Sequence, residues 1–443
     1  MKIAAHTLGC KLNYAETSDL LRRFSSLGHT IVDFHQAADL YIINTCTVTA
    51  VAEKKCRTAI RQAHRLNPEA QVAVIGCFAQ VAAAEIEKIP GVSLVLGNDR
   101  KALLPDIIRN NFDLSNFNSQ FSIFNLQYSS GDRTRTFFKI QDGCDYFCSY
   151  CAIPFARGRS RSATIEETLC MARRIADEGA KEVVLTGVNT GTFGQSERVG
   201  TSETEPFLEL LRGLDQIDGI LRYRISSIEP NLLTDNIIDF VASSRAFLPH
   251  FHIPLQGGSD HVLQLMHRRY DTALYRAKLE RIKAVMPDAC IAADIMAGFN
   301  GENEEEFRKT LDFVDSLPIS YLHVFTYSDR PGTAALRLGE KVPIPVRHEH
   351  TARLLELSEK KHRAFIDSQL GKRRPVLWES RSYEVGSQNS DQPPTSYLLP
   401  PTSYLMQGWT DNYIRLSHPY DPTLAATVTI EEITPHNLVR DAI

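Results

Sequence analysis

The 443-residue chain lacks the features of an exported or membrane-embedded protein. It contains no run of about 18 apolar residues, the length that a helix needs to cross a bilayer. Its first residues, MKIAAHTLGC, have neither the basic start nor the cleavage site of a signal peptide. It also lacks a strong excess of charge, because 49 Lys and Arg stand against 53 Asp and Glu. We therefore expect a cytoplasmic protein in which any contact with nucleic acid depends on local basic groups.

Cysteine is sparse, with nine residues in the whole chain, and a disulfide framework is not expected in a reducing cytoplasm. Three of the nine lie in GCDYFCSYC, where Cys144, Cys148 and Cys151 have the spacing C-x3-C-x2-C. Zinc usually takes four ligands, and no second cysteine pair lies nearby. Three thiolates can instead hold three irons of a 4Fe-4S cluster and leave the fourth iron open. The spacing therefore favours an iron-sulfur site.

Short apolar runs alternate with amphipathic helical stretches in the first hundred residues. We expect strands within 2–9, 29–34, 39–48, 71–80 and 91–98, and helices over 15–27 and 52–66. This order predicts a parallel α/β sheet in a domain over residues 1–115. Cys10, Cys46 and Cys77 each follow one of these strands, and the carboxyl ends of parallel strands meet at one edge. We therefore expect these three thiols to converge.

A second alternation of strands and helices covers residues 130–365. Six strand candidates lie within 136–144, 182–191, 223–230, 250–258, 291–299 and 321–328, and a closing helix is expected over 346–370. Six such units predict a partial (β/α)6 barrel with its chemistry at the strand carboxyl ends. From 371 to 437, β-like pieces at 374–380, 412–418 and 424–433 predict a small antiparallel β-barrel. Inside it, the repeat at 393–406, PPTSYLLPPTSYLM, has the composition of an exposed loop.

The cysteine motif, with Tyr150 before its last cysteine, resembles that of the radical S-adenosylmethionine superfamily. In that superfamily the open iron binds S-adenosylmethionine, and reduction cleaves this cofactor to a 5′-deoxyadenosyl radical. The earlier segments TLGCKLN, INTCTV and VIGCFAQ extend the resemblance to the radical S-adenosylmethionine methylthiotransferases. The resemblance implies that Cys10, Cys46 and Cys77 hold an auxiliary 4Fe-4S cluster with an iron open for the incoming sulfur. It also implies that the C-terminal barrel is an RNA-binding TRAM-like domain.

Within this family, three segments resemble the branch that acts on threonylcarbamoyladenosine in tRNA: RISSIEP, HFHIPLQGGSDHVLQLMHRRY and HVFTYSDRPGTAA. The resemblance implies a transferase that adds a methylthio group to C2 of N6-threonylcarbamoyladenosine at tRNA position 37. One S-adenosylmethionine would supply the methyl group and a second the radical. The implied partners are the anticodon stem-loop of tRNA, a reducing electron donor and a sulfur source, without a membrane. In DIMAGFNGENEEEF, Asn300 and Asn303 stand where the family usually has proline and threonine.

Polar residues at barrel strand ends, together with the motif tyrosine, are candidates for contact with S-adenosylmethionine or substrate: Tyr150, Asn189, Ser226, Glu229, Gln256 and Asp294. Each could instead satisfy a structural hydrogen bond. Four basic groups are candidates for RNA contact, with solvated surface as the alternative: Arg57, Arg61 and Arg65 at helical spacing; Arg157, Arg159 and Arg161; residues 267–269; and Lys372, Arg373 and Arg374. The remaining thiols, Cys56, Cys170 and Cys290, are expected to be small buried hydrophobes, and His252 and His323 to be packed in strands.

Two other substrates and one other class of protein stay open at this point. A methylthiotransferase could act on isopentenyladenosine in tRNA or on an aspartate of a ribosomal protein. A zinc-stabilised RNA-binding protein would use the same cysteines without radical chemistry. Iron and sulfide content separates the last reading from the others, because two four-iron clusters predict about eight irons per chain.

Overall fold

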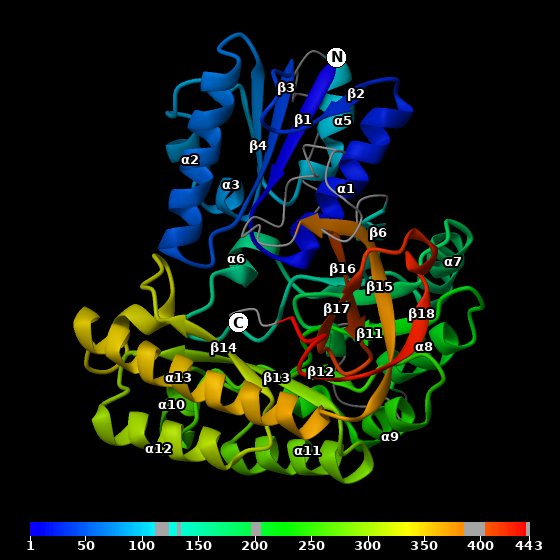
Figure 1. The fold of residues 1–443 in the computed structure, drawn as a ribbon. Helices are drawn as coiled ribbons and strands as arrows, with labels where there is room; N and C mark the ends of the chain where they lie inside the picture. The colour runs from blue at the N-terminus through cyan, green and yellow to red at the C-terminus, as the bar shows by residue number, and fades with distance from the viewer. Residues whose placement is uncertain (111–123, 131–133, 196–204, 385–403, 440–443) are drawn as a thin grey trace.

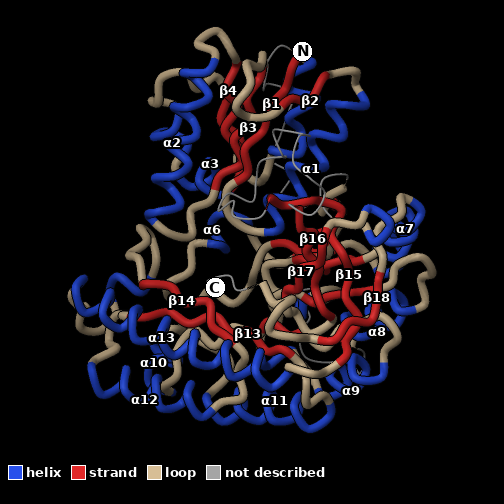
Figure 2. Tube along the Cα trace, viewed as in Figure 1, coloured by secondary structure: helices blue, strands red, loops and turns tan. Residues whose placement is uncertain are grey.

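The computed structural model describes residues 1–110, 124–130, 134–195, 205–384 and 404–439. An N-terminal parallel sheet lies above a larger curved layer of strands and helices, and an antiparallel sheet packs beside that layer (Figure 1). Figure 2 shows the same view with the strands in red, so that the three groups of strands can be told apart. No helix within the described ranges has the length and apolar character needed to cross a bilayer.

The N-terminal sheet has the parallel order β2-β1-β3-β4-β5. Its strands are β1 (Lys2–Thr7), β2 (Thr30–Val32), β3 (Leu40–Thr45), β4 (Gln71–Gly76) and β5 (Leu94–Leu96), all inside the predicted runs. The helices are α1 (Lys11–Ser26), α2 (Ala50–Leu66), α3 (Cys77–Val81), α4 (Ala83–Ile86), η1 (Lys101–Leu103) and α5 (Leu104–Arg109). Alternating strand residues enter two cores, one on each face, as for Ile42 and Ile43.

Helix α1 begins at Lys11, four residues earlier than the apolar pattern predicts. Its first turns are polar, yet Asn13 and Glu16 are fully buried. Asn13 donates hydrogen bonds to the carbonyl oxygens of Leu8 and Thr45, so its side chain ties the helix start to the ends of two strands. Hydrophobic periodicity cannot detect a helical turn that is buried through hydrogen bonds.

Six parallel strands form the partial barrel: β7 (Arg135–Lys139), β10 (Glu182–Thr186), β11 (Arg222–Ile225), β12 (His250–His252), β13 (Cys290–Ala297) and β14 (Tyr321–Thr326). A parallel bridge between Tyr223 and Phe247 links the two groups of strands. The outer layer contains α7 (Ile165–Asp177), α8 (Pro206–Asp215), α9 (Asp235–Ser243), α10 (Asp260–Leu265), α11 (Thr272–Val285), α12 (Glu304–Ser316) and the closing helix α13 (Ile344–Gln369). Asn303 caps α12 by accepting a hydrogen bond from the backbone of Glu306.

Shorter elements complete this layer. Strand β6 (Gln127–Tyr128) pairs antiparallel with β7, and β8 (Gln141–Asp142) pairs with β9 (Arg161–Ser162). One short helix, α6 (Ile153–Arg157), and the 3-10 turns η2 (Thr190–Thr192), η3 (Pro230–Leu232) and η4 (Ala334–Arg337) lie in the loops. Outward side chains such as Phe138 and Leu185 pack in one large core, whereas the alternate positions place Arg224, His252 and Asp294 in the barrel interior.

The C-terminal sheet has the antiparallel order β17-β16-β15-β18. It contains β15 (Arg373–Glu384), β16 (Tyr404–Thr410), β17 (Arg415–Pro419) and β18 (Val428–Glu432), with η6 (Pro422–Leu424) between the last two. Trp378 and Met406 share a core with Cys290 and Tyr321, so this sheet packs directly against two barrel strands. Arg222 adds hydrogen bonds from the barrel to the carbonyl oxygens of Trp409 and Pro375.

Two expectations about single segments are wrong. The end of the repeat, residues 404–406, is not a loop but the start of β16, and Met406 is fully buried; residues 393–403 lie outside the described residues. Cys170 is exposed on α7, because Thr168, Ala172 and Ile175 occupy the buried face of that helix. Cys56 and Cys290 are buried, as predicted.

Candidate functional site

The C-x3-C-x2-C motif forms a tight loop between β8 and α6. The Cys144 N–H donates to the carbonyl oxygen of Gly158 at 3.1 Å, and the Cys151 N–H donates to that of Cys148 at 3.0 Å. Two sulfurs also accept backbone hydrogen bonds. The Tyr146 N–H donates to Cys144 Sγ at 3.5 Å, and the Ile153 N–H donates to Cys151 Sγ at 3.4 Å. Hydrogen bonds to sulfur are one of the means by which proteins tune an iron-sulfur cluster.

The motif thiols are largely shielded from solvent. Burial raises the pKa of Cys144 to about 11 and that of Cys151 to about 12. Such thiols stay protonated near neutral pH, and binding of a metal cluster would displace the protons. Three cysteines in one loop, with backbone donors to their sulfurs, form a donor set that fits three irons of a cluster.

A buried arginine connects the motif to two of the predicted site residues. Arg268 donates to Cys148 Sγ at 3.1 Å and to the Tyr150 hydroxyl at 3.3 Å, and it forms an ion pair with Glu229. Its side chain is 2% exposed. Asn189 joins this group, because its side-chain oxygen accepts from the Glu229 N–H at 3.4 Å. The prediction that Arg268 and Arg157 belong to basic groups open to RNA is wrong, because both side chains are buried in ion pairs.

The other predicted contact residues lie deeper in the barrel. Asp294 is 2.7 Å from His252 Nε2, and Ser226 lines a cavity beside Cys10. Gln256 has a φ of +65°, and its N–H donates to the Asp294 carbonyl oxygen at 2.8 Å. Burial opposes ionisation of Asp294, yet His252 and His323 lower its pKa. The six predicted contact residues thus fall into one group at the motif and one group in the interior.

Donor atoms of His252, Asp294 and His323 lie within 4.8 Å of one another across β12, β13 and β14. Three such groups could in principle hold a cation. His252 already has hydrogen-bond partners at both ring nitrogens, however, with Ser227 Oγ 2.9 Å from Nδ1 and Asp294 2.7 Å from Nε2. Internal hydrogen bonds therefore account for the positions of His252 and Asp294.

The N-terminal thiols gather at the carboxyl edge of their sheet. Cys10 follows β1 and precedes α1, Cys46 follows β3, and Cys77 begins α3 directly after β4. Gly9 has a φ of +101°, and a Cβ added there would lie 2.8 Å from the Cys46 Cβ, so the two turns pack closely. Burial, with the nearby thiols of Cys77 and Cys10, raises the pKa of Cys46 to about 12. The strand ends therefore bring three thiols into one neighbourhood.

A fully buried ionic network joins the N-terminal sheet to the radical motif. Glu16 on α1 accepts from Lys139 at 2.8 Å and from Arg157 at 3.1 Å, and it forms a further ion pair with Lys101. Asp142 in turn lies 2.8 Å from Arg157 and 3.0 Å from Lys139. Burial opposes the charge on Arg157, but the nearby Cys77 and Glu16 raise its pKa well above the usual range. We name these five charged residues the interdomain network, because its ion pairs connect the part of the chain that contains Cys10, Cys46 and Cys77 to the part that contains the radical motif.

The predicted RNA-contact residues differ in their surroundings. Arg61 and Arg65 are exposed on α2, whereas Arg57 forms an ion pair of 2.8 Å with Glu85. Lys372 lies 2.5 Å from Asp288 and Arg374 lies 2.7 Å from Asp411, so both side chains join β15 to neighbouring segments; Arg373 between them is exposed.

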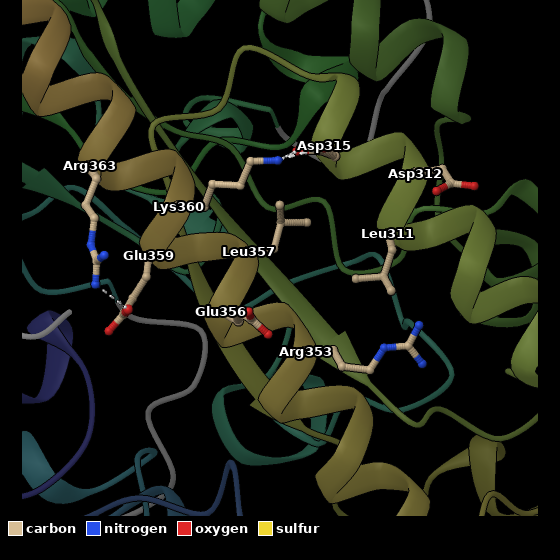
Figure 3. Close-up of a pocket in the computed structure, with 9 residues that line it drawn as sticks. All are labelled: Leu311, Asp312, Asp315, Arg353, Glu356, Leu357, Glu359, Lys360 and Arg363. Atoms are coloured by element: carbon tan, nitrogen blue, oxygen red, sulfur yellow. Dashed lines mark hydrogen bonds and ion pairs between the residues drawn. The ribbon is translucent and has the colours of Figure 1, made fainter.

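Two cavities have different surroundings. One of about 600 Å³ lies on the outer face between α12 and α13, where charged side chains such as Lys360 and Asp315 pair with each other (Figure 3). None of its lining residues is a cysteine or a predicted site residue. The other, of about 390 Å³, opens beside Cys10 and is lined by all three parts of the chain. Its position next to the N-terminal thiols makes the second cavity the candidate for substrate.

Comparison with known proteins gives matches over nearly the whole chain. The model of "Uncharacterized protein family UPF0004" matches residues 2–97, and that of the radical SAM superfamily matches residues 138–314. The chain is 36% identical to threonylcarbamoyladenosine tRNA methylthiotransferase MtaB of Bacillus subtilis, over 98% of both chains. It is 37% identical to the Aquifex aeolicus protein of the same name, covering 86% of this chain and 94% of that one.

A relative named for another nucleoside is also similar. The tRNA-2-methylthio-N(6)-dimethylallyladenosine synthase of Syntrophotalea carbinolica is 32% identical, over 86% of this chain and 89% of that one. Among solved structures, the radical S-adenosylmethionine methyltransferase TsrM of Kitasatospora setae has a TM-score of 0.53 at 14% identity, covering 73% of this chain and 72% of that one. At this identity the likeness extends to the fold alone.

Proposed function

Because this chain belongs to the radical S-adenosylmethionine methylthiotransferases, we propose that it adds a methylthio group to C2 of N6-threonylcarbamoyladenosine in tRNA. The main support for this substrate is the similarity, over 98% of the chain, to a relative named for this reaction. Further proposals are that the tRNA is bound at its anticodon stem-loop, that the reaction takes place in the cytoplasm, and that a reducing electron donor and a sulfur source take part. We also propose three domains: residues 1–115 with the auxiliary cluster, residues 130–365 as the radical S-adenosylmethionine domain, and residues 371–437 as the TRAM-like RNA-binding domain.

We assign the two cysteine groups to two 4Fe-4S clusters. Cys144, Cys148 and Cys151 would hold the cluster that, when bound, supplies the electron for cleavage of S-adenosylmethionine. Cys10, Cys46 and Cys77 would hold the auxiliary cluster, from which the sulfur comes. Arg268 orients Tyr150 and Glu229 beside the motif, and we propose that these two residues contact S-adenosylmethionine together with Asn189. Ser226 lines the cavity beside Cys10, and we propose that it contacts the substrate together with Gln256 and Asp294.

The exposed basic residues are proposed to contact phosphates. Arg61, Arg65 and Arg373 have side chains open to solvent, and a phosphate contact would replace solvent there. Arg57, Lys372 and Arg374 already form ion pairs, so an RNA contact at these residues would be shared with Glu85, Asp288 and Asp411.

Iron analysis tests the cluster assignment. Anaerobically reconstituted wild type is expected to contain about eight irons and eight sulfides per chain, and Cys77→Ala about four. Cys170→Ala is the matched control, since Cys170 is an exposed thiol outside both groups, and it should keep about eight. Zinc in place of iron would contradict the assignment, as would a Cys77→Ala variant with unchanged iron.

The substrate is tested by nucleoside analysis of tRNA. Purified holoenzyme with S-adenosylmethionine and a reductant is offered tRNA that contains threonylcarbamoyladenosine, and separately tRNA that contains isopentenyladenosine. The methylthio derivative is expected in the first case alone. If methylthio product forms from the second tRNA and not from the first, the proposed substrate is wrong and isopentenyladenosine takes its place.

A further inference from the structure

The cavity beside Cys10 lies where the N-terminal sheet, the barrel interior and the C-terminal sheet meet. Its volume is about 390 Å³. Lys11 enters from the start of α1, Arg135 and Arg224 from β7 and β11, and Tyr413 from the turn between β16 and β17. These residues are far apart in the sequence, so the cavity exists in the folded chain alone.

Lys and Arg side chains line this cavity, and one nearby carboxylate, that of Asp294, lies behind the lining His252 and is hydrogen-bonded to it at 2.7 Å. Lys11, Arg135 and Arg224 contribute to the wall, and no Asp or Glu is among its described lining residues. Arg224 is neutralised from behind by Glu182, at 2.8 Å, and also donates to the Thr410 carbonyl oxygen. Arg135 has a more distant acidic neighbour, Glu379 at 4.0 Å, and its side chain is also hydrogen-bonded to that of Tyr413. One cation of the wall is thus firmly paired, and a second is paired weakly.

The third cation of the wall is Lys11. Within the described ranges its ammonium group forms no hydrogen bond or ion pair, and its side chain is exposed. The residue also lines the cavity. An ammonium group held beside two guanidinium groups is stabilised when an anion binds between them.

A buried histidine supplies unused hydrogen-bonding capacity in the same wall. His250 is 7% exposed, and neither ring nitrogen has a hydrogen-bond partner in the described structure. Its ring stacks on Tyr413 with the ring centroids 4.3 Å apart. A polar group that is buried without a partner is costly, so a ligand that bonds to this ring recovers the lost interaction.

The titration behaviour of the wall agrees with a positive potential. Burial alone would raise the pKa of Tyr413, but Arg135, Lys11 and Arg224 together lower it below the ordinary value. Burial and the positive charge of Arg224 hold the pKa of His250 well below its usual range. The ring is therefore neutral and has one donor and one acceptor nitrogen.

We propose that the cavity binds the carboxylate of the threonylcarbamoyl group, with Lys11 and Arg135 as its charged partners and His250 as a hydrogen-bonding partner. This inference rests on the proposed function, and it names the residues that select the substrate. Among the relatives, a dimethylallyl group is apolar and has no charge to match these cations, whereas the threonine moiety carries one. A site that bonds a polar group strongly rejects an analogue without it, because its own polar groups are then left unpaired.

The location agrees with the reaction. Cys10 lies in the same wall and is one of the three thiols assigned to the sulfur-bearing cluster. Binding of the N6 substituent beside Cys10 would hold the adenine ring near the sulfur that is to be joined to C2. Lys11 and Arg135 are thus proposed as specificity-determining residues and not as participants in bond breaking.

Paired RNA probes test the proposal. Two anticodon stem-loops are compared, identical except that one carries threonylcarbamoyladenosine with its free carboxylate and the other the uncharged carboxamide. Dissociation constants are measured by fluorescence anisotropy with anaerobic holoenzyme and without S-adenosylmethionine. We expect wild type to prefer the carboxylate by about 10- to 100-fold, as for hydrogen bonds to charged groups. Lys11→Met and Arg135→Met should reduce the ratio toward one without weakening the carboxamide complex.

Lys88→Met is the matched control, because Lys88 is exposed and outside the cavity, and it should keep the wild-type ratio. Arg135 is not adjacent to an assigned cluster ligand, unlike Lys11, which follows Cys10 directly, so Arg135→Met decides the outcome if Lys11→Met loses iron. A wild-type ratio near one, or a full ratio in Arg135→Met, would overturn the proposal. The proposal would also be overturned if the Lys11 and Arg135 variants lost affinity for S-adenosylmethionine while the ratio of the two RNA dissociation constants stayed unchanged. The cavity would then hold the carboxylate of the methionine moiety. Methylthiolation of tRNA by wild type is measured in a separate assay, so failure of the proposed function can be distinguished from failure of the proposed carboxylate site.

Discussion

Cys10→Ala is expected to abolish methylthiolation of tRNA while the enzyme still cleaves S-adenosylmethionine, whereas Cys148→Ala abolishes both activities. Cys148 lies in the motif loop beside Arg268, Tyr150 and Glu229, where the cofactor would be cleaved. Cys10 follows β1 of the N-terminal sheet and lines the cavity proposed for the substrate. Sulfur insertion needs both sites, but radical formation needs the motif alone. The products 5′-deoxyadenosine and methylthio nucleoside, measured by mass spectrometry in one reaction, separate the two effects.

Cys56→Ala is the matched control for the N-terminal group. Cys56 is fully buried, and its sulfur lies 3.4 Å from the backbone nitrogen of Cys46, yet it belongs to the apolar core of the sheet. We expect this variant to lose about 1 kcal/mol of stability, a typical cost for a core truncation of this size, and to keep both activities. Loss of sulfur insertion in Cys56→Ala with its retention in Cys10→Ala would reassign the auxiliary ligands.

Glu16→Ala is expected to lower the free energy of unfolding by about 3–5 kcal/mol, the usual cost of removing one partner from a buried ion pair. The variant leaves Lys101, Lys139 and Arg157 with Asp142 as the sole carboxylate of the interdomain network. Denaturation of anaerobic holoenzyme by urea, followed by circular dichroism, measures the change. Glu85→Ala serves as the control, because its ion pair with Arg57 is on the surface and should contribute less than about 1 kcal/mol.

The same network predicts how stability depends on pH. Burial opposes ionisation of Glu16, but Arg157, Lys101 and Lys139 together hold its pKa below the ordinary value of an unfolded glutamate. The folded state therefore binds fewer protons than the unfolded state in acid. The stabilisation is fully present above about pH 4.5 and is lost as the pH falls toward the folded pKa. Glu16→Ala should show a shallower loss of stability below pH 4.5 than wild type, and equal slopes would contradict this assignment.

Much of the fold could be predicted because it depends on local patterns. Alternating apolar residues identified all the strands of the N-terminal sheet and the six of the barrel, and turn positions after strands marked Cys10, Cys46 and Cys77. The misjudged segments have a different origin. Met406 is the last residue of the repeat and becomes a core residue through the pairing of β16 with β15 and β17, which composition does not report. Cys170 lies on an amphipathic helix whose buried face is set by its neighbours in space.

The amino-acid sequence by itself determined the type of chemistry, since the spacing of Cys144, Cys148 and Cys151 within eight residues fits one loop whatever surrounds it. It also indicated which regions of the chain form parallel and antiparallel sheets, because the spacing of hydrophobic residues is a local property. Only the tertiary structure decided which charges face the substrate cavity. Lys11, Arg135, Arg224 and Tyr413 come from three sheets or their borders, and each alone reads as an ordinary surface or strand residue. Their combined potential arises from Coulomb interactions at short range across space, which no spacing along the chain encodes.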